Sequence, residues 1–416
     1  MTEPVKKRRL RLSPKLRRRL KRGLIIGSAA TPLAVGGLWF AVHKVEWLGP
    51  LVANTLRSVV GTDNVAKLED FVYGLEDRYN RFSRKDEKPK AYWEVPPEPS
   101  AAPPGSASAA GALAPKPPRF RPANVGPMLK SWSAPGDGDW VPIRDARRPG
   151  EEPYLYKTLL HPDPNRSWAE VFVVAVDLSR VKVYAVAGRN EPKSVEKEAQ
   201  SYQRVARIPD DHQDLVLGAF NGSFMTEHGY YGMKVDGLTL VKPRDKSCTI
   251  AVYADSRMRI ANWKELADSE PKMEWFRQAP SCMYENGKLH PGLEAGGGAH
   301  WGATLDGETV IRRSAAGIDP KGEVLYVGIT NHTTARAIAT AMHHAGASEV
   351  TQLDVNWSYP KFVLFEPGAD GQRKAVALAK GFEFSDDEYI RKRSLRDFFY
   401  LMPKDLMAKS AVKKSM

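Results

Sequence analysis

The sequence predicts an α+β protein with a mixed, mainly antiparallel sheet and a few helices, preceded by one N-terminal transmembrane helix. Three observations support this prediction. Many short apolar runs rich in β-branched residues are separated by turns that contain Gly and Asn, which is typical of antiparallel strands. Few stretches show the apolar spacing of three and four residues that marks a helix. Residues 23–42 carry no charge, and about twenty such residues suffice to cross a bilayer as a helix.

The net charge of +13 is concentrated at the N-terminus. Residues 1–22 hold eleven Lys and Arg against one acid, Glu3, and the rest of the chain holds 51 basic and 48 acidic residues. Basic residues before an apolar run keep the N-terminus in the cytoplasm. We therefore predict a basic cytoplasmic tail over 1–22, a single-pass membrane anchor over 23–42, and a main domain that is periplasmic or extracellular. A long signal peptide is the alternative for 23–42. Because the remainder shows no basic face, we predict no nucleic-acid partner.

The residues after the anchor divide into four parts by composition. Residues 43–84 are predicted to be a helical stalk, and residues 85–138 a Pro/Ala-rich linker, because twelve of the 31 prolines lie between 85 and 135. Residues 139–403 are predicted to be the globular domain, and residues 404–416 a basic C-terminal tail. The stalk is predicted to be a helix because its apolar residues are spaced by three and four: Val65, Leu68, Val72, Leu75, Tyr79 and Phe82.

Within the globular part, two β-rich runs, 169–176 and 181–187, are separated by four residues and predict a hairpin. A helix is predicted over 333–344, with Thr333 as its N-cap and Gly346 as the residue that ends it. These elements alternate with short strands rather than with long helices. The pattern therefore favours an antiparallel sheet over a doubly wound parallel one.

A short apolar strand ends at the stretch 218–224, which reads Gly-Ala-Phe-Asn-Gly-Ser-Phe. Asn221 and Gly222 tolerate positive φ, so we predict a sharp turn directly after a buried strand. Such a turn would present the Asn221 side chain and free main-chain N–H groups at the edge of a sheet. An ordinary β-turn without a functional role is the alternative.

The chain has two cysteines, Cys248 and Cys282. On the oxidising side of a membrane such a pair suits a disulfide, and two unpaired buried thiols are the alternative. No Cys/His spacing resembles a zinc site, so we predict no metal and no cofactor, although the sequence leaves a divalent cation open.

Four segments, taken in order and spacing, resemble the phosphodiester glycosidase family. They are Asn221-Gly222-Ser223-Phe224, Gln278-Ala279-Pro280, Arg313-Ser314-Ala315-Ala316-Gly317-Ile318 and Gln352-Leu353-Asp354. The resemblance extends over residues 165–366 and leaves the tail, anchor and linker outside it. It implies a hydrolase that cleaves a sugar-1-phosphodiester in an envelope or extracellular glycan.

Side-chain chemistry suggests roles for the residues in these segments. The guanidinium group of Arg313 suits a pair of phosphate oxygens, and Asp354 could serve as general acid/base or nucleophile. Asn221 would orient a sugar hydroxyl or a phosphate oxygen. Asp236 or Glu227 could supply a second carboxylate. The remaining predicted substrate contacts are Gly222, Trp357 and Ser358.

One motif departs from the family. Its last segment usually reads L-D-G-G-G-S, whereas this chain has Leu353-Asp354-Val355-Asn356-Trp357-Ser358. Val355 resists positive φ and Trp357 is bulky, so only Asn356 would take a left-handed conformation cheaply. The turn must therefore have a different shape. This leaves a second hypothesis open, a catalytically inactive protein that binds envelope glycan with Trp357 as a stacking platform.

Overall fold

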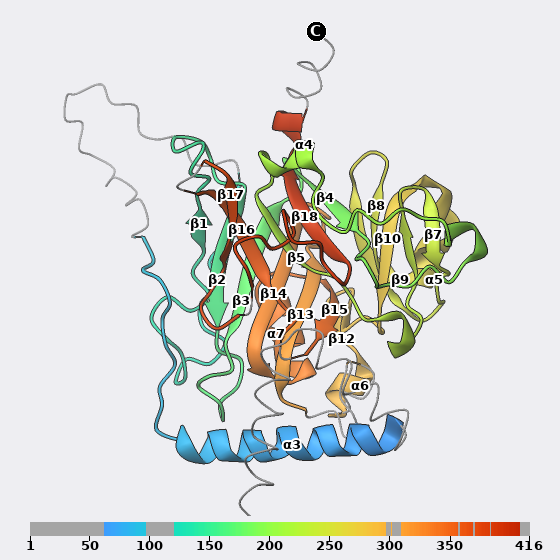
Figure 1. Cartoon of the computed structure of the whole chain (residues 1–416). Helices are drawn as coiled ribbons and strands as arrows, with labels where there is room; N and C mark the ends of the chain where they lie inside the picture. The colour runs from blue at the N-terminus through green and yellow to red at the C-terminus, as the bar shows by residue number, and fades with distance from the viewer. Residues whose placement is uncertain are drawn as a thin grey trace, which may run out of the picture. The chain divides into compact units, whose positions relative to one another are not determined.

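The computed structural model describes residues 62–96, 120–296, 301, 309–356, 358–368, 371–382 and 384–407 (Figure 1). These residues form a mixed α+β fold with three antiparallel sheets and few helices. The predicted tail 1–22 and anchor 23–42 lie outside the described residues, as does most of the predicted tail 404–416. Across the described part of the chain, no helix is both long enough and apolar enough to cross a membrane.

The largest sheet has eight strands. In spatial order they are β1 (Val141–Ile143), β2 (Leu155–Leu160), β3 (Val171–Asp177), β14 (Val324–Thr333), β13 (Ile311–Ile318), β15 (Glu349–Val355), β11 (Tyr284–Glu285) and β12 (Lys288–Leu289). Strand β3 is apolar except for its last residue, and all seven of its residues are buried. Successive side chains of a strand point to opposite faces, so both faces of this sheet are covered by other structure.

Helix α7 (Ala335–His344) covers one face of the sheet (Figure 1). Gly328 of β14 allows this close packing, because a Cβ atom there would lie 2.4 Å from Sδ of Met342. The N-cap is Thr334, whose hydroxyl accepts a hydrogen bond from an N–H of the first turn. The sequence predicted Thr333, one residue earlier, and helix boundaries are the part of an element that apolar spacing defines least well.

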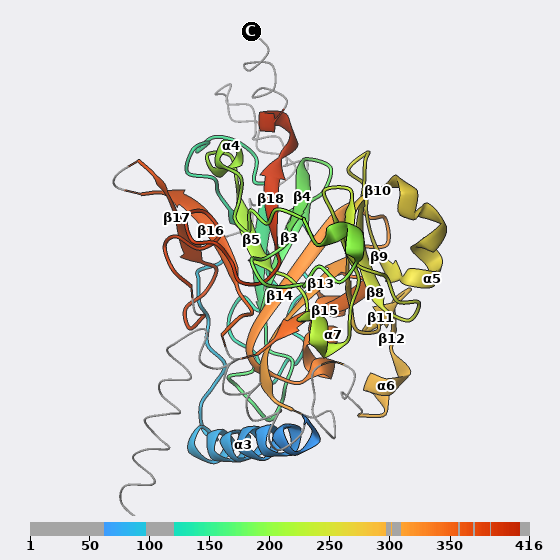
Figure 2. The same ribbon diagram turned by 45° about the vertical axis from the view of Figure 1, so that its right-hand side comes forward.

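Two five-stranded sheets cover the opposite face. One consists of β7 (Leu238–Val241), β6 (Met233–Val235), β10 (Met273–Ala279), β8 (Cys248–Tyr253) and β9 (Met258–Asn262). The other consists of β17 (Arg373–Ala377), β16 (Phe362–Pro367), β5 (Gly218–Asn221), β18 (Phe398–Pro403) and β4 (Val181–Val186). In Figure 2, β16 and β17 lie on the left of the molecule, and β8, β9 and β10 lie on the right. Phe172, Trp275 and Phe399, one from each sheet, belong to the same buried cluster, so the three sheets share a core.

The other helical segments are short, apart from α3. They are α3 (Thr62–Ser83), α4 (Asp210–Gln213), α5 (Trp263–Leu266), α6 (Pro291–Glu294) and the 3-10 turns η1 (Lys197–Ala199), η2 (Thr226–His228) and η3 (Ala267–Lys272). Helix α3 lies within the predicted stalk and agrees with the apolar spacing found there.

The predicted hairpin between 169–176 and 181–187 does not form. Both runs are strands, but β3 pairs with β2 and β14, whereas β4 pairs with β18 in another sheet. Both edges of β3 are already occupied, so the turn over 178–180 passes the chain to the third sheet. This prediction is wrong because strand pairing depends on distant partners that the local pattern does not contain.

Both described ends of the predicted linker pack against the domain. The Tyr92 hydroxyl donates to Glu170 over 2.6 Å, and its ring lies edge-on to Phe172. Phe120 packs in the same way against Tyr156. The packed structure therefore begins before residue 139, because the Pro-rich segment carries aromatic side chains that bury apolar surface.

Cys248 and Cys282 are joined by a disulfide that connects the start of β8 with the turn after β10. The two residues are 34 positions apart and both are fully buried. Replacing both by Ala should lower the free energy of unfolding by about 3–4 kcal/mol, because the unfolded chain loses a cross-link that closes a loop of this length. Denaturant titration of the oxidised wild type, the reduced wild type and the double variant would measure this loss. A change below about 1 kcal/mol in the double variant would contradict it.

Candidate functional site

Polar side chains from all three sheets meet where β5, β15 and β10 end and β18 begins. Asp354 lies near the end of β15, and Tyr359 follows in the next turn. Arg396 and Asp397 directly precede β18, and Arg277 lies on β10. We call these five residues the Asp354 cluster. The four segments singled out in the sequence all border it: the ends of β5, β15 and β10, and β13 through Ser314.

Gly222 joins the main chains of the cluster. Its carbonyl accepts a hydrogen bond from Asp354 N–H over 3.1 Å, and its own N–H donates to the carbonyl of Asp397 over 2.9 Å. A Cβ atom at Gly222 would lie 2.1 Å from Oδ2 of Asp397. The sequence predicted glycine here for positive φ, but Gly222 is not among the positive-φ residues. Close approach of the Asp397 side chain, rather than the backbone angle, requires glycine at this position.

A β-bulge sets the position of Asp354. Arg313 of β13 is paired with Val355, yet Ala315 is paired with Gln352, so β15 contains one extra residue in this stretch. Bulges redirect side chains next to active sites. The Asp354 carboxylate accepts a hydrogen bond from Val355 N–H over 2.9 Å through Oδ1, and it pairs with Arg396 through Oδ2.

The surroundings of Asp354 raise the pKa of its carboxyl group from the usual 3.8 to about 6. Burial is the main cause, and the negative charge of Asp397 acts in the same direction. Arg396 and the N–H of Val355 lower the pKa but offset burial only in part. A carboxyl group with this pKa can both hold and release a proton near pH 6, as general acid/base catalysis requires.

Arg396 contacts both Asp354 and the ring of Tyr359. The guanidinium carbon of Arg396 lies 4.7 Å from the centre of the Tyr359 ring, a cation–π arrangement. The Tyr359 hydroxyl donates to the carbonyl of Asp397 over 2.6 Å. Burial raises the pKa of Tyr359 well above its usual value, so this hydroxyl stays protonated. The side chain of Arg396 is 15% exposed against 2% for Asp354, so the arginine is the part of this pair that solvent reaches.

Arg277 and Asp397 form a buried ion pair beneath the cluster. Nε of Arg277 lies 2.8 Å from Oδ2 of Asp397, and each side chain is only 1% exposed. Arg277 also donates to the carbonyl oxygens of Phe224, Tyr231 and Gln278. This pair holds the segment before β18 against β10 and so fixes the place from which Arg396 reaches Asp354.

Arg313 does not join the Asp354 cluster. Its guanidinium group is fully buried and donates to the carbonyl oxygens of Thr333, Trp301 and Thr309 and to the Gln352 side chain. Burial lowers its pKa to about 9. Neighbouring side chains of a strand point to opposite faces, so Ser314 faces Asp354 and Arg313 faces away. This geometry corrects the phosphate-holding role inferred for Arg313 and gives its side chain a structural role.

Asn221 lies beside the cluster as a bridge between strands. Its side-chain amide donates to Ser314 Oγ over 2.8 Å and to the carbonyl of Gly222, while its carbonyl oxygen accepts from Lys361 N–H. Ser314 in turn donates to the main-chain carbonyl of Asp354 over 2.9 Å. All these groups are buried, so Asn221 positions Asp354 through Ser314 rather than offering its amide to a ligand.

The turn after β15 is built on Asn356. Its side-chain oxygen accepts hydrogen bonds from the N–H groups of Ser358 and Tyr359, over 2.9 and 2.6 Å, which defines an Asx turn. Asn356 is the residue of this turn that could take positive φ at low cost, but its φ is not positive. Ser358 also bonds to Asn356 through its hydroxyl, and the predicted contact Trp357 lies outside the described residues.

The two candidates for a second carboxylate, Asp236 and Glu227, lie outside the Asp354 cluster. Asp236 has φ of 51° in the turn between β6 and β7, and its carboxylate accepts a hydrogen bond from the Tyr202 hydroxyl over 2.6 Å. Glu227, in η2, is half exposed and pairs with Lys193. Neither position adds a carboxylate to the Asp354 cluster, so the site as described has Asp354 and the ion-paired Asp397.

Sequence reasoning overlooked Arg277, Tyr359, Arg396 and Asp397. Arg277 had a visible signal, because it is the one basic residue in the buried strand Met273–Ala279 and directly precedes the Gln278-Ala279-Pro280 segment. Arg396 and Asp397 directly precede the apolar strand β18. A charged pair at the start of a buried strand is a signal that pattern reading could have used.

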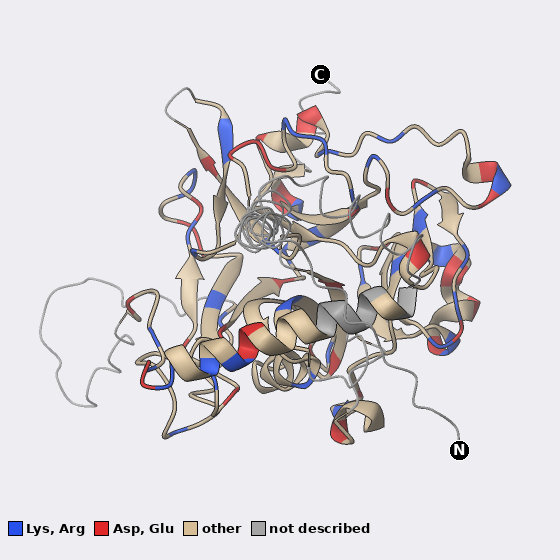
Figure 3. Ribbon diagram, turned by 60° about the horizontal axis from the view of Figure 1, so that its bottom comes forward, with Lys and Arg blue, Asp and Glu red and all other residues tan. Residues whose placement is uncertain are grey.

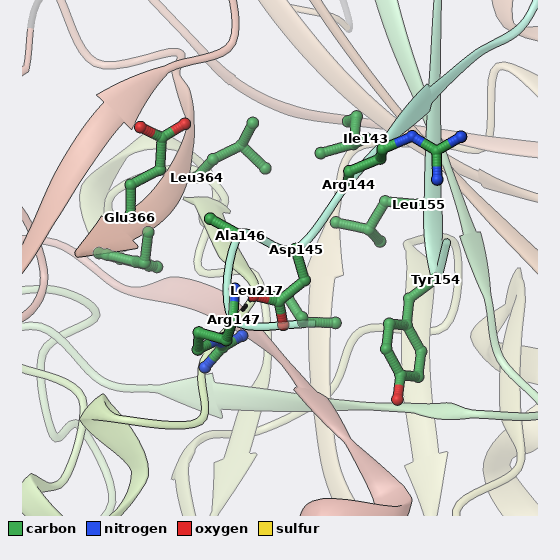
Figure 4. A pocket seen from close by; sticks show the side chains of 11 residues that line it. Ile143, Arg144, Asp145, Ala146, Arg147, Tyr154, Leu155, Leu217, Leu364 and Glu366 are labelled. Atoms are coloured by element: carbon green, nitrogen blue, oxygen red, sulfur yellow. Dashed lines mark hydrogen bonds and ion pairs between the residues drawn. The ribbon is translucent and has the colours of Figure 1, made fainter. Parts of the chain in front are cut away.

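No group of three or more His, Cys, Asp or Glu side chains in the described ranges is placed to hold a metal ion. A surface hollow with an empty volume of about 420 Å³, open solvent included, lies at the start of β5 (Figure 4). The Asp354 cluster lies at the other end of this strand. The hollow is lined by Ile143, Asp145, Tyr154, Leu217, Leu364 and Glu366, among others.

Comparison with known proteins gives structural likenesses only. No family model matches the sequence, and no curated protein matches it. The catalytic domain of zebrafish N-acetylglucosamine-1-phosphodiester alpha-N-acetylglucosaminidase, auto-inhibited by its pro-peptide, is similar at a TM-score of 0.39 and 14% identity, over 61% of this chain and 85% of that one. A hypothetical protein from Synechocystis is similar at a TM-score of 0.34 and 9% identity, over 60% of this chain and 62% of that one. The chain is thus a distant structural neighbour of a hydrolase catalytic domain.

Proposed function

We propose that this protein is a membrane-anchored, outward-facing hydrolase that cleaves the glycosidic bond of a sugar-1-phosphodiester in an envelope or extracellular glycan. One observation carries the proposal. Asp354, a buried carboxyl group with a pKa of about 6, is paired with a partly exposed arginine where segments that resemble phosphodiester glycosidases meet. The anchored, outward-facing arrangement rests on the basic residues of 1–22 and the uncharged run 23–42.

In this proposal Arg396 takes the phosphate-binding role first inferred for Arg313. A guanidinium group presents paired N–H donors to phosphate oxygens, and Arg396 is the basic residue of the cluster that reaches solvent. Its pairing with Asp354 places a bound phosphate next to the carboxyl group. Burial lowers the pKa of Arg396, but Asp354 and Tyr359 more than offset it, so the arginine stays charged.

The chemical step requires one bond to break and one to form at the anomeric carbon. Protonated Asp354 gives its proton to the bridging oxygen as the bond between this oxygen and the anomeric carbon breaks. A water oxygen adds to the anomeric carbon, and the proton that this water releases restores the acid. The products are a free sugar and a phosphomonoester.

A second candidate is a glycan-binding protein without catalytic activity. Both carboxylate oxygens of Asp354 are already engaged, one by Val355 N–H and the other by Arg396. The turn that follows is an Asx turn on Asn356 rather than a run of glycines. These contacts would have to loosen during turnover, whereas a binding protein could keep them.

Hydrolysis in ¹⁸O-labelled water tests the proposal. The full chain would be incubated with methyl phosphodiesters of several sugar 1-phosphates, and phosphomonoester formation followed by ³¹P NMR. Cleavage at the anomeric carbon places ¹⁸O in the sugar, whereas attack at phosphorus places it in the phosphate. Label in the sugar supports the proposal, and label in the phosphate contradicts it. Saturable binding of these diesters without any turnover favours the glycan-binding candidate.

The pH dependence provides a separate prediction. If protonated Asp354 is the acid, kcat/KM should fall as pH rises through about 6. Arg396 lowers the pKa of Asp354, so Arg396→Gln should move the pH at which kcat/KM falls to a higher value. It should also weaken substrate binding. Arg393→Gln is the matched control, since Arg393 is exposed and bonds to the carbonyls of Val205 and Arg204. If kcat/KM fell at the same pH in both variants, ionisation of Asp354 would not be the cause of the fall.

A further inference from the structure

Helix α3 carries an apolar face that is turned to solvent. Val72, Leu75, Tyr79 and Phe82 are 43%, 46%, 69% and 78% exposed, far more than apolar side chains of a packed helix. They recur along one side of the helix. In Figure 3 the charged residues of the described α3 ribbon occupy a few positions between uncharged ones. An apolar stripe of this kind marks a surface for another partner.

The spacing of this stripe follows a strict seven-residue repeat. From Val65 to Phe82 the intervals are three, four, three, four and three residues, which is the a and d pattern of a coiled coil. Val65, Val72 and Tyr79 take the a positions, and Leu68, Leu75 and Phe82 take the d positions. Among parallel coiled coils, valine at a with leucine at d favours two strands over three or four, so the first two repeats suit a dimer.

The attachment of α3 to the domain leaves this seam open. Asp77 occupies the f position, opposite to a and d, and its carboxylate forms a two-pronged ion pair with Arg166. The two bonds measure 2.6 and 2.7 Å, and both side chains are largely buried. The domain therefore holds α3 at Asp77, and it also reaches one flank of the seam, where Glu76 lies 3.8 Å from Nε2 of His332. The a and d side chains Val72, Leu75, Tyr79 and Phe82 stay exposed.

We propose that α3 forms a parallel two-stranded coiled coil with α3 of a second copy of this chain. The flanking charges favour the parallel over the antiparallel arrangement. Glu69 and Glu76 both take e positions, and antiparallel helices place e opposite e, so two like charges would face each other. Parallel helices place each g residue opposite the partner's e residue five positions later, so Phe71 meets Glu76 and Arg78 meets Ser83, and no two like charges face each other. Three repeats form a short coiled coil, so confinement of both chains by the predicted anchor would strengthen it through effective concentration.

Cysteine cross-linking in the full chain tests the proposal. The two native cysteines are bonded to each other, so an added thiol is the reactive one. In a parallel dimer each d residue meets its own copy, and Leu75→Cys should oxidise to a disulfide-linked dimer in detergent micelles. Arg81→Cys is the matched control, because Arg81 is exposed on the same helix but takes a c position away from the seam. The Leu75→Cys dimer should exceed the control by about tenfold, since a disulfide needs Cβ atoms about 4 Å apart.

Every outcome decides for or against the parallel dimer. Equal cross-linking at both positions, or none at Leu75, overturns it. A Leu75→Asp/Phe82→Asp variant that keeps the thermal melt of the wild type should be monomeric by light scattering, whereas the wild type has twice the monomer mass. A monomeric wild type in micelles that also fails to cross-link in lipid vesicles would contradict the proposal. In that case a fluorophore on Leu75→Cys that shifts to the blue in vesicles would assign the face to the bilayer.

Discussion

Asp354→Asn is expected to reduce turnover of a sugar-1-phosphodiester by about 10²–10⁴-fold while substrate binding is largely kept. Asn has the shape of Asp and can still accept the Val355 N–H bond, but it cannot transfer a proton. The substitution leaves the contact of Arg396 with the Tyr359 ring, and with it the proposed phosphate-binding group, in place. The effect should therefore appear in kcat rather than in KM.

The control for this experiment is Asp255→Asn. Asp255 is an exposed turn residue between β8 and β9 and pairs with Arg257. Turnover by this variant should equal that of the wild type, and thermal melts should show that all three proteins are folded. Equal turnover by folded Asp354→Asn would remove Asp354 from the mechanism. Binding without turnover by every variant, the wild type included, would favour the glycan-binding candidate.

Breaking the Arg277–Asp397 pair should lower the free energy of unfolding by about 3–5 kcal/mol, the largest stability effect that we expect from a single substitution. Both side chains are 1% exposed, so Asp397→Ala leaves a buried guanidinium group without its carboxylate. It also removes the acceptor for Ser223 N–H. Because Asp397 precedes β18, the loss should also disturb the position of Arg396 and hence activity.

The measurement is denaturant unfolding of Asp397→Ala beside a matched surface variant. Glu227→Ala breaks the ion pair with Lys193, in which both side chains are about half exposed. Exposed pairs of this kind are worth less than about 1 kcal/mol. The double variant Arg277→Met/Asp397→Ala should lose less than the sum of its two single variants, because neither buried charge is then left alone. Comparable losses in Asp397→Ala and Glu227→Ala would show that the buried pair does not stabilise the fold.

Several properties of this protein follow from the sequence by itself. Short β-branched runs between Gly and Asn turns predict the antiparallel α+β fold, because backbone preference and burial both act over a few residues. The apolar spacing between Val65 and Phe82 predicts α3 for the same reason. The resemblance carried by four motifs predicts that Asn221, Arg313 and Asp354 lie at one place. The structure brings Asn221 and Asp354 together through Ser314 and the main chain of Gly222, and it leaves Arg313 outside.

Only the tertiary structure decided which charged groups accompany Asp354. Arg396 lies 42 residues beyond Asp354 along the chain, and Asp397 lies 120 residues beyond Arg277. Such pairs form when strands of different sheets end side by side. Local sequence patterns do not predict which strand ends become neighbours. The choice between Arg313 and Ser314 depends on which face of β13 each side chain occupies, and a shift of one residue reverses it. A bulge in β15 then determines where Asp354 points, because one extra residue changes the alternation of side chains along the strand.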